Sequence, residues 1–182
     1  MTDTPWGWFH QTAAAFAALV PAARPVGGTG QYELDVDGIT DAFRLKRGKD
    51  TVNQNHIYRG EPLVVHVPPA DDEDEAEGRW YVLPVSWLIS YALENPVSRQ
   101  HTVHALDCFS FPSSQLTSSH EVDTEGLPQT IADAIRESRA DDIVRAIRAI
   151  RRARVISVAE FEDAADTAAN ALGLPIPTET TA

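Results

Sequence analysis

Two alternating segments around an Asp-Gly dipeptide constrain the fold of this chain more than any other feature. Residues 32–37 alternate apolar and acidic side chains, which is typical of a β-strand with one buried face. Asp37-Gly38 follows directly, and this dipeptide is a strong signal for a two-residue hairpin turn. We therefore predict an antiparallel hairpin whose second strand runs from Ile39 to about Arg47.

The same periodicity predicts the other elements. Apolar residues recur at three- and four-residue steps in residues 6–20, which indicates a helix that Pro21 ends. Short apolar and β-branched segments predict strands, and longer amphipathic segments predict helices. The predicted strands are residues 62–67 and 79–84, with a further strand within 101–112, and the predicted helices are residues 85–95, 127–140, 141–155 and 157–173.

Segments rich in glycine or in charge separate these elements. We expect loops at residues 23–31 and 112–126, an irregular segment at 50–60, and disorder in the acidic stretch 70–78. The order of the elements predicts an α/β domain with a small central mixed sheet flanked by helices. Residues 1–126 would form this core, residues 127–175 a helical C-terminal extension, and residues 176–182 a tail.

Composition argues against several classes of protein. The formal net charge of −12 repels nucleic acid on average, so DNA binding would need a local basic surface. Cys108 is the only cysteine and cannot form an internal disulfide, which favours a reducing compartment. No apolar run reaches the roughly 18 residues of a membrane span. A signal peptide would require Lys or Arg before its apolar segment, and none precedes the alanine-rich N-terminal segment. We therefore expect a cytoplasmic protein with no membrane partner.

The hairpin carries residue types that metal-dependent phosphodiester cleavage needs. Such a site uses carboxylates to hold Mg²⁺ and a nearby cation to support the attacking water. Asp35 on the first strand and Lys46 on the second supply both types. If Val36 pairs with Ile39, however, Lys46 lies some six residues beyond the partner of Asp35, or roughly 20 Å along a flat strand. The two would meet only if the strand bends or the turn is longer.

Over residues 6–95 the chain resembles the PD-(D/E)xK nuclease superfamily. The resemblance is carried by the leading helix, the strands YELDV and FRLK, and the later strands LVVHV and RWYVLP. It implies a restriction-endonuclease-like fold, Mg²⁺ as cofactor and DNA as substrate, with Asp35 as the first metal ligand and Lys46 as the motif lysine. The chain departs from the family at Arg44, where an acid is expected. Either Asp41 or Glu33 replaces that acid as a metal ligand, or the domain binds DNA or protein without cleaving it.

A structural explanation exists for the same hairpin residues. Glu33, Asp35 and Asp37 would form its solvent-exposed face. The basic run RLKRGK would be a charged strand end that prevents edge-to-edge pairing.

Positive charge is concentrated in two segments of this acidic chain. Residues 136–154 contain seven arginines against three acids, and residues 44–50 are also basic. Both segments predict contacts to a DNA backbone. An arginine-rich helix also suits an acidic protein partner, as in a non-enzymatic adaptor or a homodimer formed through the C-terminal helices. The candidate DNA-binding residues are Arg44, Arg47, Lys49, Arg145, Arg148, Arg151 and Arg152.

The remaining reactive or aromatic residues favour structural roles. His101, His104 and Cys108, with His66 or His120, have spacings that could hold zinc, but the paired cysteines of structural zinc sites are missing. We expect Cys108 to be a buried core residue instead. Trp80 and Tyr81 are neighbours on an alternating strand, so one should face the core and the other the solvent.

Overall fold

The computed structural model describes residues 7–26, 30–48, 51–55, 59–69, 78–94, 108–153 and 158–174. The chain divides into two compact units. The first, which we call the sheet unit, comprises Met1–Val52, Glu61–Leu83 and Phe111–Arg136. The second, the helical unit, comprises Asn53–Gly60, Pro84–Ser110 and Glu137–Ala182. In the part of the chain that is described, no helix is both long enough and apolar enough to cross a membrane.

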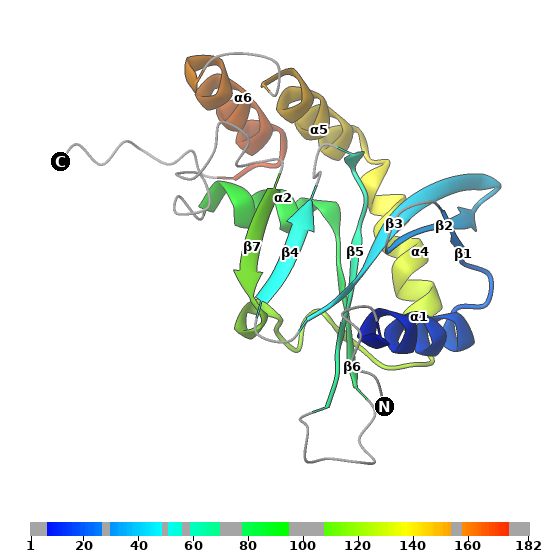
Figure 1. Ribbon diagram of the computed structural model, residues 1–182. Coiled ribbons are helices and arrows are strands. Elements are labelled where there is room, and N and C mark those ends of the chain that lie inside the picture. Colours follow the sequence, from blue (N-terminus) through cyan, green and yellow to red (C-terminus); the bar gives the residue numbers. More distant parts are fainter. Residues whose placement is uncertain are drawn as a thin grey trace. The chain divides into compact units, whose positions relative to one another are not determined.

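The sheet unit is built on a six-stranded mixed sheet (Figure 1). Its strand order is β1-β2-β3-β5-β6-β8, in which β3 and β5 are parallel and every other neighbouring pair is antiparallel. The expected α/β fold with a small mixed sheet and flanking helices is confirmed. The strands are β1 (Arg24–Pro25), β2 (Gln31–Val36), β3 (Ile39–Arg47), β5 (Leu63–Val67), β6 (Arg79–Leu83) and β8 (Glu121–Val122).

One face of this sheet forms a core with the helices α1 (Gly7–Leu19) and α4 (Leu127–Ser138). Phe16 of α1 is fully buried, and its ring lies 5.0 Å from that of Tyr32, 5.7 Å from Phe43 and 5.9 Å from Trp80. Helix α4 adds four buried side chains, those of Leu127, Ile131, Ala134 and Ile135. The helix that we assigned to the C-terminal extension therefore packs on the sheet through most of its length.

The predicted hairpin is confirmed residue by residue. Val36 pairs with Ile39, and Asp35 pairs with Thr40. Asp37 and Gly38 have φ angles of 57° and 76°, which is the positive-φ turn that matches the right-handed twist of the flanking strands.

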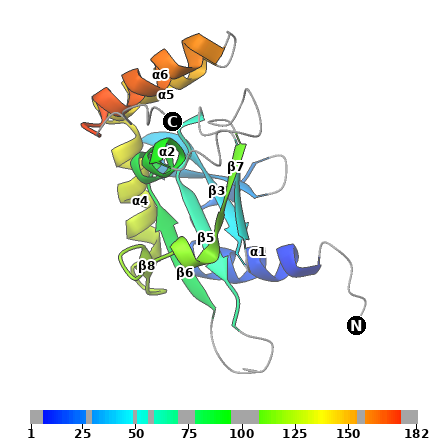
Figure 2. The same cartoon turned by 90° about the vertical axis from the view of Figure 1, so that its left-hand side faces the viewer.

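The helical unit contains α2 (Val85–Glu94), α5 (Asp141–Ala153) and α6 (Val158–Ala171). Helices α5 and α6 lie side by side, as both views show (Figures 1 and 2). Small buried residues of α6, including Ala168 and Ala169, allow the helices to pack closely. As predicted, α6 ends near Gly173, whose φ of 65° and backbone bonds from residues 173 and 174 to Asn170 and Ala169 form a glycine cap.

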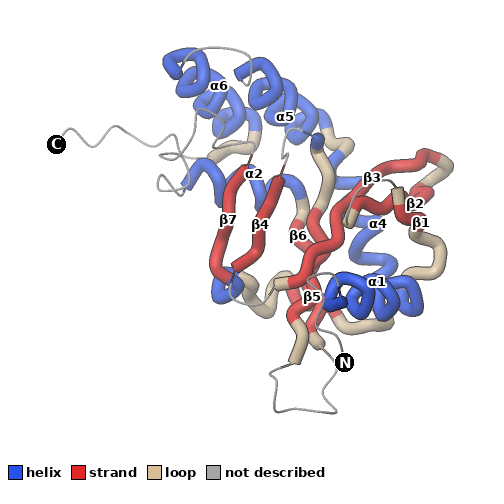
Figure 3. Tube along the Cα trace, in the orientation of Figure 1, coloured by secondary structure: helices blue, strands red, loops and turns tan. Residues whose placement is uncertain are grey.

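Several predictions about the fold are wrong. Residues 51–55, which we expected to be irregular, form β4 (Thr51–Asn55), and this strand pairs with β7 (Cys108–Pro112) in a separate two-stranded sheet (Figure 3). The short strands β1 and β8 lie in segments that we predicted as loops. Trp80 and Tyr81 are both only 4% exposed, because β6 is buried on both faces.

Candidate functional site

The strand register separates the three carboxylates that we proposed as metal ligands. Residues directly opposite each other in an antiparallel pair share a face of the sheet. Glu33 lies opposite Ala42 and Asp35 opposite Thr40, whereas Asp41 lies opposite the core residue Leu34. Glu33 and Asp35 are therefore on one face and Asp41 is on the other, so Asp35 and Asp41 do not converge.

Lys46 shares a face with Asp35 but lies far along the strand. It pairs with Val65 of β5 and has no partner in β2. Six residues separate it from Thr40, the partner of Asp35, which corresponds to roughly 20 Å. Among the described residues, no group of three or more His, Cys, Asp or Glu side chains is arranged to hold a metal ion.

Arg44, at the position where the nuclease family has an acid, is part of a buried ion pair. Its Nε donates a hydrogen bond of 2.6 Å to Oε2 of Glu61, and these side chains are only 11% and 8% exposed. The other carboxylate oxygen of Glu61 accepts a bond of 2.9 Å from Nε2 of Gln31, which lies opposite Arg44 in the register. The guanidinium that we predicted to contact DNA is thus neutralised within the protein.

Sequence reasoning missed Glu61 altogether. The residue lies between Gly60 and Pro62, immediately before the apolar strand β5. An isolated acid entering a buried strand is itself a signal, because a buried carboxylate requires a partner. Among the other basic residues nearby, Lys46 shares a face of β3 with Arg44, and Arg47 lies on the α1 face. Lys49 is outside the described residues.

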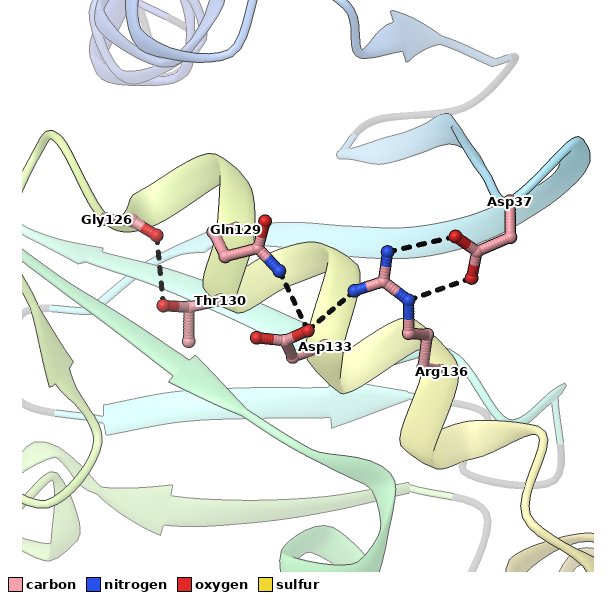
Figure 4. Close-up of polar contacts among 6 residues, drawn as sticks. All are labelled: Asp37, Gly126, Gln129, Thr130, Asp133 and Arg136. Atoms are coloured by element: carbon pink, nitrogen blue, oxygen red, sulfur yellow. Dashed lines mark hydrogen bonds and ion pairs between the residues drawn. The ribbon is translucent and has the colours of Figure 1, made fainter.

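An exposed cluster connects the hairpin turn to α4 (Figure 4). Nε and a terminal nitrogen of Arg136 donate to the two carboxylate oxygens of Asp37 at 2.8 and 3.1 Å, and its other terminal nitrogen donates to Asp133 at 2.6 Å. These hydrogen bonds raise the pKa of the Arg136 guanidinium. The bidentate contact fixes the turn, which indicates a structural role for Asp37.

Helix α5 presents three arginines to solvent. Arg145, Arg148 and Arg151 are all exposed and follow one another at steps of three residues, so they lie along one side of the helix. We call them the arginine stripe. The opposite side of α5 is buried and includes Ile143, Ala146, Ile147 and Ile150. The backbone of Arg152 continues the helix, but its side chain is outside what the structure describes.

A pair of aromatic rings lies on α2 in the same unit as the arginine stripe. Trp87 and Tyr91 are one turn apart and stacked, with ring centroids 5.2 Å apart and planes inclined by 20°. Both side chains are half-buried, and burial raises the pKa of the Tyr91 hydroxyl.

The described histidines do not form the zinc set that we considered. His66 shares a hydrogen bond with Thr12, and His120 shares one with Thr117, at 3.1 and 3.2 Å. Burial lowers the pKa of both rings, with a further contribution from Arg47 at His66. His101, His104 and the side chain of Cys108 fall outside the described residues.

Comparison with known proteins adds no relative: no family model, no curated protein and no solved structure matches this chain.

Proposed function

We propose that this chain is a binding protein that holds the phosphate backbone of DNA against the arginine stripe, without cleaving it. The exposure of Arg145, Arg148 and Arg151 on one side of α5 carries this proposal. The net charge of −12 does not oppose it, because interactions between exposed charges are largely screened beyond about 8 Å at physiological salt. A local basic surface can therefore attract DNA to a protein that is acidic overall. We place this activity in the cytoplasm, as the single cysteine suggests.

The anchoring of α5 favours binding through this stripe. The apolar side of the helix is buried, so the backbone beneath the arginines is already ordered before a ligand binds. Arg145 and Arg151 are separated by about 9 Å along the helix, over which one DNA strand carries two or three phosphates. Each guanidinium can donate two parallel hydrogen bonds to a phosphate.

Two features of the sheet unit favour binding without cleavage. Arg44 replaces the expected acid and is neutralised by Glu61. The register places Asp35 and Asp41 on opposite faces of the hairpin. If the resemblance to the nuclease superfamily reflects ancestry, this would be a degenerate member that retains only a role in DNA binding.

The stacked pair Trp87 and Tyr91 supports a second candidate, an adaptor that binds a protein. Half-exposed aromatic side chains and arginine are both enriched in protein–protein interfaces. The arginine stripe would then face an acidic surface of the partner, or of a second copy of this chain.

Fluorescence anisotropy of a labelled DNA duplex at increasing salt concentrations tests the proposal. We expect Arg148→Gln to reduce the slope of log K against log salt by about 0.9. Replacing all three stripe arginines by glutamine should reduce it by about 2.7. Arg24→Gln is the matched control, because it removes an equivalent charge from the exposed strand β1.

Three results would reject DNA binding without cleavage. Equal weakening by Arg148→Gln and Arg24→Gln would mean that the loss of any single positive charge has the same effect, and that the stripe makes no specific contact with DNA. If the protein nicks plasmid DNA in the presence of Mg²⁺ and Lys46→Ala abolishes this activity, the nuclease interpretation would be correct. Absence of DNA binding, together with a protein complex that the triple variant disrupts, would establish the adaptor.

A further inference from the structure

The sheet unit contains a cavity of ≈ 370 Å³ between α1 and the sheet, beside the ends of β3, β5 and β6. Its volume lies within the range of ligand pockets, about 300–1,000 Å³. Arg47, His66 and Trp80 line it from three neighbouring strands, and the register places them in one row across the sheet. Thr12 and Ala15 line it from α1.

The polar part of this lining is held in place before any ligand binds. Nδ1 of His66 lies 3.1 Å from Oγ1 of Thr12, which is only 3% exposed. The His66 ring stacks on Trp80, with centroids 4.3 Å apart and planes inclined by 23°. A Cβ atom at Gly78 would overlap Nε2 of His66, so glycine is required beside the ring. The imidazole is therefore fixed by its hydrogen bond with Thr12, by its stacking on Trp80 and by the close backbone at Gly78.

The described lining of the cavity carries a positive charge. Arg47 is the cation among the described residues that line it, and that lining includes no Asp or Glu. Burial and, secondarily, the charge of Arg47 keep the pKa of His66 below its usual value, which favours the neutral imidazole. The remaining surface is largely apolar and includes Ala15, Leu19 and Pro68.

From this geometry we propose that the cavity binds a small apolar molecule that carries one anionic group. The apolar body would lie between α1 and the sheet, and the anionic group would accept hydrogen bonds from Arg47. Thr12 and His66 would orient the ligand as neutral polar groups. The proposal is independent of DNA binding, because it depends on side chains of the sheet unit and not on the arginine stripe.

Isothermal titration calorimetry with 2-naphthoate, and with its neutral analogue 2-naphthamide, tests this site. We expect naphthoate to bind one-to-one and more tightly than naphthamide. Arg47→Gln should weaken naphthoate binding about tenfold and leave naphthamide binding unchanged, since only the charged ligand gains the ionic hydrogen bond.

Two variants of α1 locate the binding. Ala15→Phe fills the cavity from an exposed helix position, so it should weaken both ligands at least tenfold without unfolding the protein. Ala17→Phe adds the same ring at another exposed position of α1 that does not line the cavity, and should have no effect. The triple arginine-stripe variant should bind naphthoate like the wild type.

Four outcomes would overturn the proposal. Two of them are a failure of naphthoate to bind at all and equally tight binding of naphthamide. Ala15→Phe and Ala17→Phe could weaken binding to the same extent, or the stripe variant could lose naphthoate. The last two results would place the ligand elsewhere on the protein.

Discussion

Neutralising Glu61 should destabilise the sheet unit strongly, although the substitution Glu61→Gln changes almost no volume. The carboxylate accepts hydrogen bonds from Arg44 and Gln31 at 2.6 and 2.9 Å. With glutamine in its place, the Arg44 charge remains buried, because that side chain is 11% exposed. The variant thus leaves a desolvated cation without its counter-charge.

The expected loss of stability follows from this burial. Removing one partner of a buried ion pair costs about 3–5 kcal/mol, and the lower end applies because glutamine keeps one acceptor oxygen. That loss is a large fraction of the roughly 5–15 kcal/mol that stabilise a typical domain. The midpoint of thermal unfolding should fall by roughly 6–12 °C for a loss of about 3 kcal/mol.

A double-mutant cycle measures the pair itself. We would follow urea unfolding by circular dichroism for Glu61→Gln, Arg44→Gln and the double variant. Hydrogen exchange of the Leu45 amide, which bonds to the carbonyl of Gly30 at 2.7 Å, adds a local measure within the sheet unit. The double variant should lose about 1.5–3 kcal/mol less of its free energy of unfolding than the two single variants lose together, because it buries no unpaired charge.

The control and the contradicting results are clear. Arg24→Gln, on an exposed strand, should change stability by less than about 0.5 kcal/mol. If Glu61→Gln costs no more than this control, the carboxylate is not neutralising a buried cation. If the single effects simply add, Arg44 and Glu61 are not coupled, and Arg44 becomes available as a DNA contact.

Two further predictions concern a glycine and a buried histidine. Gly60→Ala should lower the free energy of unfolding by about 1–3 kcal/mol, measured by thermal unfolding, because φ is 70° and the new Cβ would lie 2.7 Å from Cδ1 of Ile147. Gly173→Ala is the control and should cost less, because its φ is 65° but the space around it is open. Equal losses for the two variants would contradict a clash at Gly60. Burial lowers the pKa of His66 below 6.5, so the unfolded chain takes up this proton first. The free energy of unfolding is therefore highest above pH 6.5 and decreases as the pH falls through the pKa of His66 in the folded protein. An NMR titration that gives the ring a pKa of 6.5 or more would refute this.

Elements encoded by local signals were predictable from the sequence. The hairpin depends on the alternation of β2 and on a turn whose two residues tolerate positive φ, and all of this information lies between Gln31 and Arg47. The buried stripe of α5 is likewise a local pattern, visible as isoleucines at steps of three and four residues.

Features that depend on distant partners were not predictable. Strand β4 has a polar sequence, TVNQN, and is defined by pairing with β7 more than fifty residues later. Glu61 and Arg44 are 17 residues apart, and Thr12 and His66 are 54 apart. No periodicity in either segment indicates such a contact. The sequence therefore suggested for His66 only a place in a zinc set that it did not favour, and did not predict the cavity that the residue lines.

The secondary structure around each basic run decides whether it forms a surface patch. On β3 the side chains alternate between faces, so Arg44 and Lys46 point to one side, and Arg47 points to the α1 side, where it lines the cavity. On α5 a step of three residues nearly completes a turn, and Arg145, Arg148 and Arg151 gather on the exposed side. Two runs of similar charge density in the sequence therefore have different uses. The strand places Arg44 in a buried ion pair and Arg47 in the lining of the cavity, whereas the helix exposes Arg145, Arg148 and Arg151 together, as the proposed contact with DNA requires.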